Sequence, residues 1–123
     1  MTTQEIADRL HELCSKGKYE TAQKELYADD AVSIEPEGAM GMPERVEGME
    51  AIIAKGDAFQ AMIEEYHSVS AGTPIVSGNF IAMTIDIDAT MKGFGRMPMS
   101  EIALYEVTDG KISKEQFFYS IKQ

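Results

Sequence analysis

The chain has 123 residues, of which 44% are hydrophobic, so it is long enough to bury one core as a single domain over residues 1–123. Twenty-one acidic residues against eleven basic ones give a net charge of −10, which disfavours binding to nucleic acids and to anionic membrane surfaces. One cysteine, Cys14, excludes an internal disulfide bond and a thiolate metal site. Because no apolar run is long enough to span a membrane and residues 1–6 show no secretion signal, we expect a cytoplasmic protein.

Two helices are expected at the start of the chain. Thr2 and Glu5 have the spacing of a capping box, in which each side chain bonds the free backbone N–H of the other residue. Apolar residues then recur at helical spacing, namely Ile6, Leu10, Leu13 and Cys14. This stripe predicts that Cys14 serves in packing, and Gly17 is a typical helix end. A second, shorter helix is expected from Tyr19 to a point near residues 29–30.

The middle of the chain combines a short strand, a loop and a long helix. Residues 32–35 have the pattern of a strand, which Pro36 ends because proline cannot donate a hydrogen bond to a neighbouring strand. Residues 36–47 contain two prolines and two glycines, which indicates a loop. Apolar residues from Met49 to Tyr66 then recur at three- and four-residue steps, so the clearest helix is predicted there.

From His67 onward the apolar pattern has a period of two, which predicts strands. Glycine-containing turns separate four such segments, which are residues 67–76, 80–91, 97–107 and 111–121. Within the second segment the odd positions are apolar and most even positions are polar, so one face is buried and the other faces water. Helices grouped first and long strands after them predict an α+β fold rather than alternating βαβ units.

Three segments carry a resemblance to a known superfamily. Residues 26–32 (Leu-Tyr-Ala-Asp-Asp-Ala-Val) resemble the segment that leads into the first strand of this superfamily. Residues 46–52 (Val-Glu-Gly-Met-Glu-Ala-Ile) resemble the start of its third helix. Residues 105–112 (Tyr-Glu-Val-Thr-Asp-Gly-Lys-Ile) resemble the hairpin that joins its last two strands. This nuclear transport factor 2-like superfamily includes ketosteroid isomerases and SnoaL-like polyketide cyclases, and the SnoaL-like branch is the most similar. The resemblance implies a cystatin-like cone, with three N-terminal helices packed on the concave face of a curved, mixed and mainly antiparallel sheet around an apolar pocket.

The resemblance to ketosteroid isomerases also implies positions for site residues. Their general base is a carboxylate just before the proline that ends the first strand, and Glu35 before Pro36 matches this placement. Their oxyanion donors, a tyrosine and an aspartate, align with Leu10 and Ala103, so both donors are absent here. Tyr119 matches an aromatic residue that lines their pocket. The resemblance therefore argues against steroid isomerase activity and leaves a carboxylate at the pocket mouth.

Glu101 is the most informative candidate for chemistry. It shares a strand face with Ala103, which the resemblance places inward, so Glu101 is expected to point into the pocket. A carboxylate in apolar surroundings has a raised pKa and can exchange a proton near neutral pH. Two alternatives stay open: Ile102 and Leu104 form the buried face and leave Glu101 in water, or Glu101 pairs with Arg96 at the edge of the strand.

His67 opens the first long strand and is a second candidate. Its unperturbed pKa near ~6.5 suits proton relay, and a pair with Glu101 would form an acid–base dyad. The alternative is a partly exposed histidine with no task. Because His11 is the only other histidine, a histidine-rich metal site is not expected, and the aspartates of residues 86–88 fit a solvated strand face. We expect neither a metal nor a cofactor.

Glu35 is a third candidate, although Ile34 is the better inward residue on strand periodicity, so an inward Glu35 requires a twist or bulge. Met40 and Met42 in the glycine- and proline-rich loop are candidates for a lid. The remaining candidates for the ligand pocket, which serve equally well as plain core, are Phe59, Met62, Ile63, Met83, Ile85, Met99, Ala103 and Tyr119.

Three functions follow from these residues. In the first, a small, largely apolar organic molecule enters the cone, and Glu101 or Glu35 with His67 catalyses isomerisation, cyclisation or dehydration. In the second, the same pocket serves a non-catalytic carrier or sensor. In the third, the fold is a homodimerisation module that associates through apolar residues of the last two strands, namely Ile102, Leu104 and Phe118.

Overall fold

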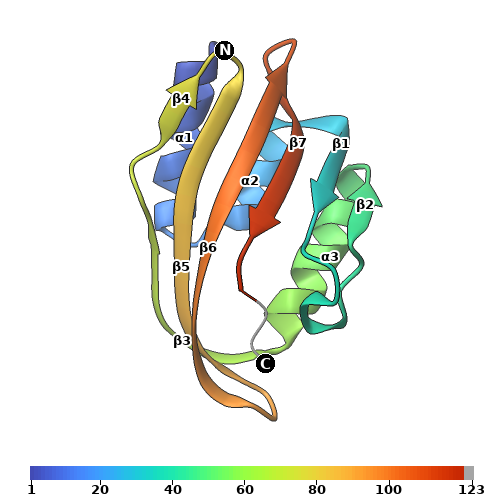
Figure 1. Cartoon of the computed structure of the whole chain (residues 1–123), viewed down its shortest axis with the longest axis vertical. Helices are drawn as coiled ribbons and strands as arrows, with labels where there is room; N and C mark the ends of the chain where they lie inside the picture. The colour runs from blue at the N-terminus through green and yellow to red at the C-terminus, as the bar shows by residue number, and fades with distance from the viewer. Residues whose placement is uncertain (121–123) are drawn as a thin grey trace.

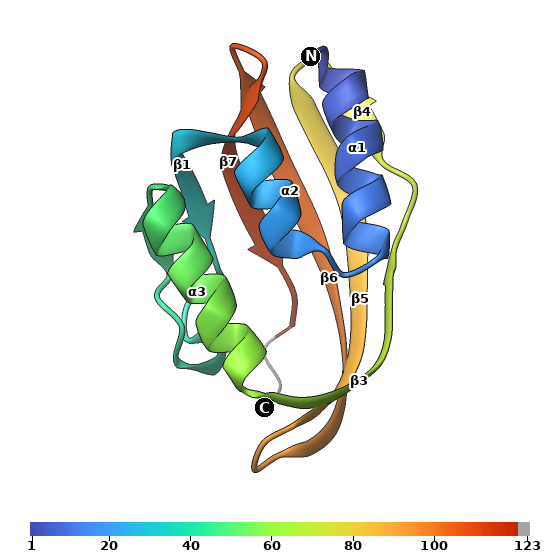
Figure 2. The ribbon, with the colours of Figure 1, turned by 180° about the vertical axis from the view of Figure 1, so that it is seen from behind.

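The computed structural model of the protein describes residues 1–120, except the side chain of Met40. In this range three α-helices cover one face of a curved seven-stranded sheet, and the opposite face carries no helix (Figures 1 and 2). This confirms the predicted α+β fold with helices on the concave face of a mixed, mainly antiparallel sheet. No helix in the described range has the length and apolar character needed to cross a membrane.

The first helix, α1 (Thr3–Ser15), begins at the predicted capping box. The backbone N–H of Glu5 donates to Thr2 Oγ1 (3.1 Å), and the backbone N–H of Thr2 donates to Glu5 Oε1 (2.8 Å). Its apolar stripe packs against the sheet and consists of the buried residues Ile6, Ala7, Leu10, Leu13 and Cys14. Gly17 follows with a φ of +72°, which favours glycine and ends the helix.

The second helix, α2 (Tyr19–Leu26), is shorter than expected. The predicted end near residues 29–30 is wrong, because strand β1 (Tyr27–Ile34) begins directly after Leu26. Tyr27 already pairs with Ile112 of the last strand, and its side chain is buried in the core. Tertiary pairing therefore overrides the helical pattern of this segment.

The segment after β1 contains more structure than the expected loop. It includes a 3₁₀ turn, η1 (Ala39–Gly41), and strand β2 (Arg45–Glu47), which pairs antiparallel with β1. Helix α3 (Met49–Ala61) follows, and the prediction that it extends to Tyr66 is wrong. Strand β3 (Ile63–Ala71) starts there because it pairs with β5, an edge contact that the apolar spacing of the sequence does not reveal.

The prediction of a single strand over residues 67–76 is wrong, because that segment is divided between the end of β3 and a separate short strand, β4 (Ile75–Ser77). The three later strands lie where they were predicted and are β5 (Phe80–Met91), β6 (Gly95–Thr108) and β7 (Lys111–Phe118). The sheet order is β2-β1-β7-β6-β5-β3, with β4 also paired to β5, and only the β1–β7 pair is parallel in the described range. The last strand of the chain therefore lies in the middle of the sheet, between β1 and β6 (Figure 1).

Candidate functional site

Strand β6 presents its odd-numbered residues to the helices. Ala103 and Tyr105 are buried, whereas Ile102, one residue before Ala103, is 52% exposed on the opposite face. Glu101 has the same parity as Ala103 and pairs in register with the buried Ile85 of β5, so it lies on the inner face of the sheet. The alternative pair with Arg96 is not formed, because that guanidinium bonds a different carboxylate on the outer face.

The environment of Glu101 stabilises its protonated form. Burial raises the pKa of this carboxyl to about 8, and the nearby carboxylates of Glu35 and Glu115 act in the same direction, while Lys55 opposes them. Glu101 is half-buried and makes no hydrogen bond or ion pair with any other residue of the range 1–120. At neutral pH it is therefore a carboxylic acid with an uncommitted proton on the inner face of the sheet.

Glu35 is also turned inward, so the expectation that Ile34 is the inward residue is wrong. The Glu35 side chain is buried just beyond the end of β1 and has the same parity as the buried Ala31 and Ser33, because the register of β1 with β7 shifts earlier in the strand, between Tyr27 and Val32. Tyr119 donates its hydroxyl to Glu35 Oε1 (2.7 Å), and Lys55 Nζ donates to Glu35 Oε2 (2.8 Å). The Lys55 and Glu35 side chains are 8% and 7% exposed, which makes this a buried ion pair.

A second buried carboxylate, Glu115 of β7, continues the polar cluster. The hydroxyl of Tyr27 donates to Glu115 Oε1, and Ser33 Oγ donates to Glu115 Oε2 (2.6 Å). Lys55 Nζ also donates to Ser33 Oγ (2.5 Å), which joins the two carboxylates into one network. Burial raises the pKa of Glu115, and the two hydroxyl donors counteract that rise.

Sequence reasoning missed Lys55, Ser33 and Glu115. A signal for Lys55 existed, because it stands three residues after the buried Ile52 and thus on the inner stripe of α3. A charged lysine on a buried stripe is stable only if an anion is buried beside it, and Glu35 is that anion. The pairing of the Glu115 strand with β1 offered no local signal, since it is a long-range parallel contact.

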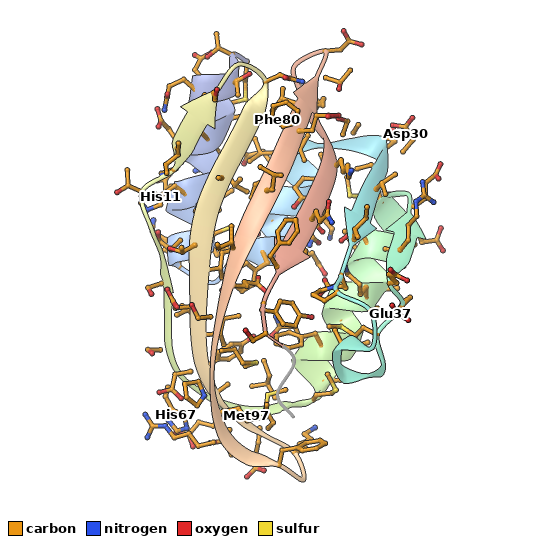
Figure 3. All side chains as sticks on the ribbon, in the orientation of Figure 1. His11, Asp30, Glu37, His67, Phe80 and Met97 are labelled. Carbon is orange, nitrogen blue, oxygen red and sulfur yellow. The ribbon has the colours of Figure 1, made fainter. Side chains whose placement is uncertain are left out.

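The structure does not bring His67 and Glu101 together. The His67 ring bonds Thr90 Oγ1 (2.7 Å), and Thr90 belongs to the polar outer face of β5. A register shift between residues 66 and 68 gives His67 this orientation, which strand alternation alone could not indicate. Figure 3 shows His67 and Met97 toward the end of the sheet that holds the β5–β6 turn. The expected acid–base dyad is therefore absent.

The other pocket candidates divide into two groups. Met83, Ile85 and Ala103 are buried in the core of the sheet, and the Tyr119 hydroxyl is committed to Glu35. The side chains of the second group are partly buried, namely those of Phe59, Met62, Ile63 and Met99. Of the two lid candidates, Met42 is half-buried, and the side chain of Met40 lies outside the described part of the structure.

Two surface hollows approach the interior. One of about 270 Å³ is lined partly by Glu35, Phe117 and Tyr119. The other, of about 660 Å³, lies between the α1–α2 connection, the end of α3 and β3. Glu101 lines neither hollow, so the expected apolar pocket around it stays a prediction. No three side chains of metal-binding type converge within the described range.

The same architecture occurs in solved structures. A proposed SnoaL-like polyketide cyclase [carbohydrate phosphatase] from Mesorhizobium loti is 37% identical, with a TM-score of 0.87 over 97% of this chain and 100% of that one. An NTF2-like protein of unknown function from Burkholderia pseudomallei is 15% identical, with a TM-score of 0.79 over 98% of this chain and 92% of that one. A hypothetical protein with a ketosteroid isomerase-like fold from Catenulispora acidiphila, in complex with trimethylamine, is 19% identical. Its TM-score is 0.71 over 98% of this chain and 88% of that one.

Among curated proteins, no sequence matches the chain significantly. The more distant of these structures establish the fold alone, and the Mesorhizobium protein adds similarity along the whole sequence. The SnoaL-like domain family matches residues 1–119. The chain therefore belongs to the SnoaL-like domain family, as the resemblance of its sequence indicated.

Proposed function

We propose that the protein binds a small, largely apolar organic molecule on the inner face of the sheet and that Glu101 exchanges a proton with it. The observation that carries the proposal is the state of Glu101, a carboxyl with a pKa of about 8 and no partner within residues 1–120. A protonated acid of this kind can donate to a ligand oxygen or carbon at neutral pH. The surrounding apolar residues favour a ligand with a hydrophobic body.

The reaction type that fits this arrangement is a proton transfer in which Glu101 neither gains nor loses a proton over the whole reaction. Glu101 donates its proton at one position of the ligand and regains a proton from another position, which leaves the carboxyl as it began. Isomerisation follows this balance directly, and cyclisation or dehydration follows it with bond formation or loss of water in the same ligand. Glu35, held by Lys55 and Tyr119, is the second carboxylate near this position.

A non-catalytic carrier or sensor is the alternative use of the same site. Glu101 is then a hydrogen-bond donor that recognises a ligand carbonyl, and no reaction follows. The absence of oxyanion donors at Leu10 and Ala103 favours this alternative, because such donors often supply the largest electrostatic term in catalysis.

A thermal-shift screen over apolar carbonyl compounds tests the proposal. Compounds that stabilise the wild-type protein should lose most of that effect in Glu101→Gln, while Glu106→Gln, on the outer face of the same strand, should respond like wild type. If Glu101→Gln keeps every ligand response, the proposal is wrong. Turnover of a stabilising compound by wild type but not by Glu101→Gln would favour the enzyme over the carrier.

A homodimer is a second proposal, and the outer face of the sheet supports it. Ile102 and Phe118 are 52% and 46% exposed and pair directly across β6 and β7. Phe80, on the neighbouring strand β5 and labelled in Figure 3, is 43% exposed. Exposed apolar side chains gathered on one face of a sheet are typical of a protein interface. The partner that best fits an extended face of this kind is the same face of a second copy.

A further inference from the structure

The larger hollow, of about 660 Å³, has a rim with basic side chains in an otherwise acidic protein. Its border consists of the α1–α2 connection, the C-terminal end of α3 and strand β3. Figure 2 shows where these segments lie on the helical side of the molecule. Lys16 and Lys18 both line it, and they are two of only eleven basic residues in a chain of net charge −10. The basic rim is therefore a local exception to the charge of the molecule.

The nearby acidic side chains do not neutralise this rim. Glu12 lies 3.9 Å from Lys16, but its other oxygen accepts a closer contact from Arg9 (2.7 Å). Lys18 forms no ion pair with any other residue of the range that the structure describes. Both lysines are exposed at the rim, so their charges are available to an anion in the hollow.

One acidic residue and one helix end also lie at the rim. Glu20 also lines the hollow, but its carboxylate pairs with Lys24 (3.0 Å) on the next turn of α2. The N-terminus of α2 lies at the rim, and its N-cap residue Lys18 makes no side-chain cap bond. The partial positive charge of the helix N-terminus therefore adds to that of the lysines.

Tyr19 connects this hollow to the Glu101 site. Its side chain lines the hollow, while its hydroxyl is buried and has no hydrogen-bond partner within the described residues. Burial raises the pKa of Tyr19, and the ionisable groups of Cys14, Tyr66 and Glu101 raise it to a smaller extent. An unpaired buried hydroxyl is rare because it costs free energy, so this hydroxyl is a position where a ligand oxygen can complete the bonding.

We propose that the ligand of the Glu101 site is an amphipathic organic anion, with its carboxylate at Lys16 and Lys18 and its apolar body against Tyr19, where a ligand oxygen bonds the unpaired hydroxyl. This inference rests on the proposed function and names the class of its ligand. In this proposal the ligand enters through the hollow and reaches from there toward Glu101, which does not itself line the hollow. The carboxylate stays at the rim, where water still solvates it, so no unpaired charge is buried.

The test compares 2-naphthoate with 2-naphthamide, which have the same apolar body and carbonyl group but differ in charge. Binding is measured at pH 7 by titration of backbone amide NMR signals. Wild type should bind the anion roughly fivefold more tightly than the amide, as two exposed lysine contacts allow. The Lys16→Gln/Lys18→Gln double variant should lose this preference. Lys92→Gln/Lys111→Gln, which removes the same charge at two hairpin turns, should keep it.

A second variant separates the lysines from the hydroxyl. Tyr19→Phe should weaken both compounds by roughly fivefold, since one hydrogen bond is lost while the anion preference remains. Equal binding of anion and amide by wild type, or an unchanged preference in the Lys16→Gln/Lys18→Gln variant, would overturn the inference. Failure of both compounds to bind would overturn it as well. The proposed function is tested separately by the response of Glu101→Gln to uncharged carbonyl compounds, because that response does not depend on the rim lysines.

Discussion

The carboxyl of Glu101 keeps its proton over a pH range in which the unfolded chain loses it. Its pKa is about 8 in the folded protein and near the ordinary value of 4.5 in the unfolded chain. The folded state therefore binds more protons between these values, and the free energy of unfolding falls as pH rises from 4.5 to 8. At 1.36 kcal/mol per pKa unit the loss amounts to at most about 5 kcal/mol.

This pH dependence is a prediction for urea unfolding between pH 5 and pH 9. Wild type should lose stability toward pH 9, and Glu101→Gln should show a flatter curve because the amide does not ionise. Glu115, whose pKa is also raised, should leave a fall of the same sign in that variant. Parallel curves for the two proteins would show that Glu101 is ionised in the folded state and would remove the basis of the proton-transfer proposal.

The buried pair of Lys55 and Glu35 supports a second prediction. Lys55→Met leaves the Glu35 carboxylate buried without its cation, so the variant should lose about 3–5 kcal/mol of unfolding free energy. Lys55→Met/Glu35→Gln should recover part of that loss, since no unpaired charge then remains. Chemical unfolding of both variants at pH 7 measures the difference. A double variant no more stable than Lys55→Met would mean that the two side chains do not interact as described.

Only part of the candidate site was predictable from the sequence. Periodicity puts Glu101 on the same strand face as Ala103, the resemblance to ketosteroid isomerases puts Ala103 inward, and the structure places Glu101 on that side. His67 could not be placed because a register shift turns it outward. The Lys55 network joins residues from β1, α3 and β7, and the pairing of β1 with β7 has no signal in local sequence. Such contacts depend on tertiary structure, which periodicity does not contain.

Among the secondary-structure elements, α1 has the most explicit start signal. Thr2→Ala removes the hydroxyl that caps the Glu5 amide and should lower the free energy of unfolding by about 1 kcal/mol. Thr3→Ala, one residue further along and without a capping bond in the described structure, is the matched control and should change stability little. Thermal or chemical unfolding measures both. Equal effects of the two substitutions would contradict the role of the cap.

The elements that sequence reasoning located well are those with strong local signals. The capping box and Gly17 bound α1, and the alternation of residues 80–91 matches β5 from end to end. The errors fall where an apolar helical pattern meets a strand, at the end of α2 and at the end of α3. Tyr27 and Ile63 both satisfy helical spacing, but each belongs to a strand that pairs with a distant segment of the chain, Tyr27 with β7 and Ile63 with β5.

For the whole molecule, the exposed apolar face predicts self-association. Ile102→Lys/Phe118→Lys places two charges at the centre of the proposed interface, so a wild-type dimer should dissociate to monomers. Gln4→Lys, on the exposed surface of α1, adds a charge away from that face and should leave the dimer intact. Sedimentation velocity at micromolar concentration distinguishes the two states. A wild-type protein that sediments as a monomer throughout this range contradicts the proposed dimer.

The position of β7 has a consequence for how the protein is made. Residues 111–118 are synthesised after every other strand, yet they lie between β1 and β6 and are the only described link between the two parts of the sheet. A nascent chain that lacks them carries β1 and β2 as an isolated ribbon, with Tyr27 and Ser33 deprived of Glu115. The two halves can join only when this strand emerges from the ribosome. Until then, the part of the chain already made keeps apolar surface exposed to solvent.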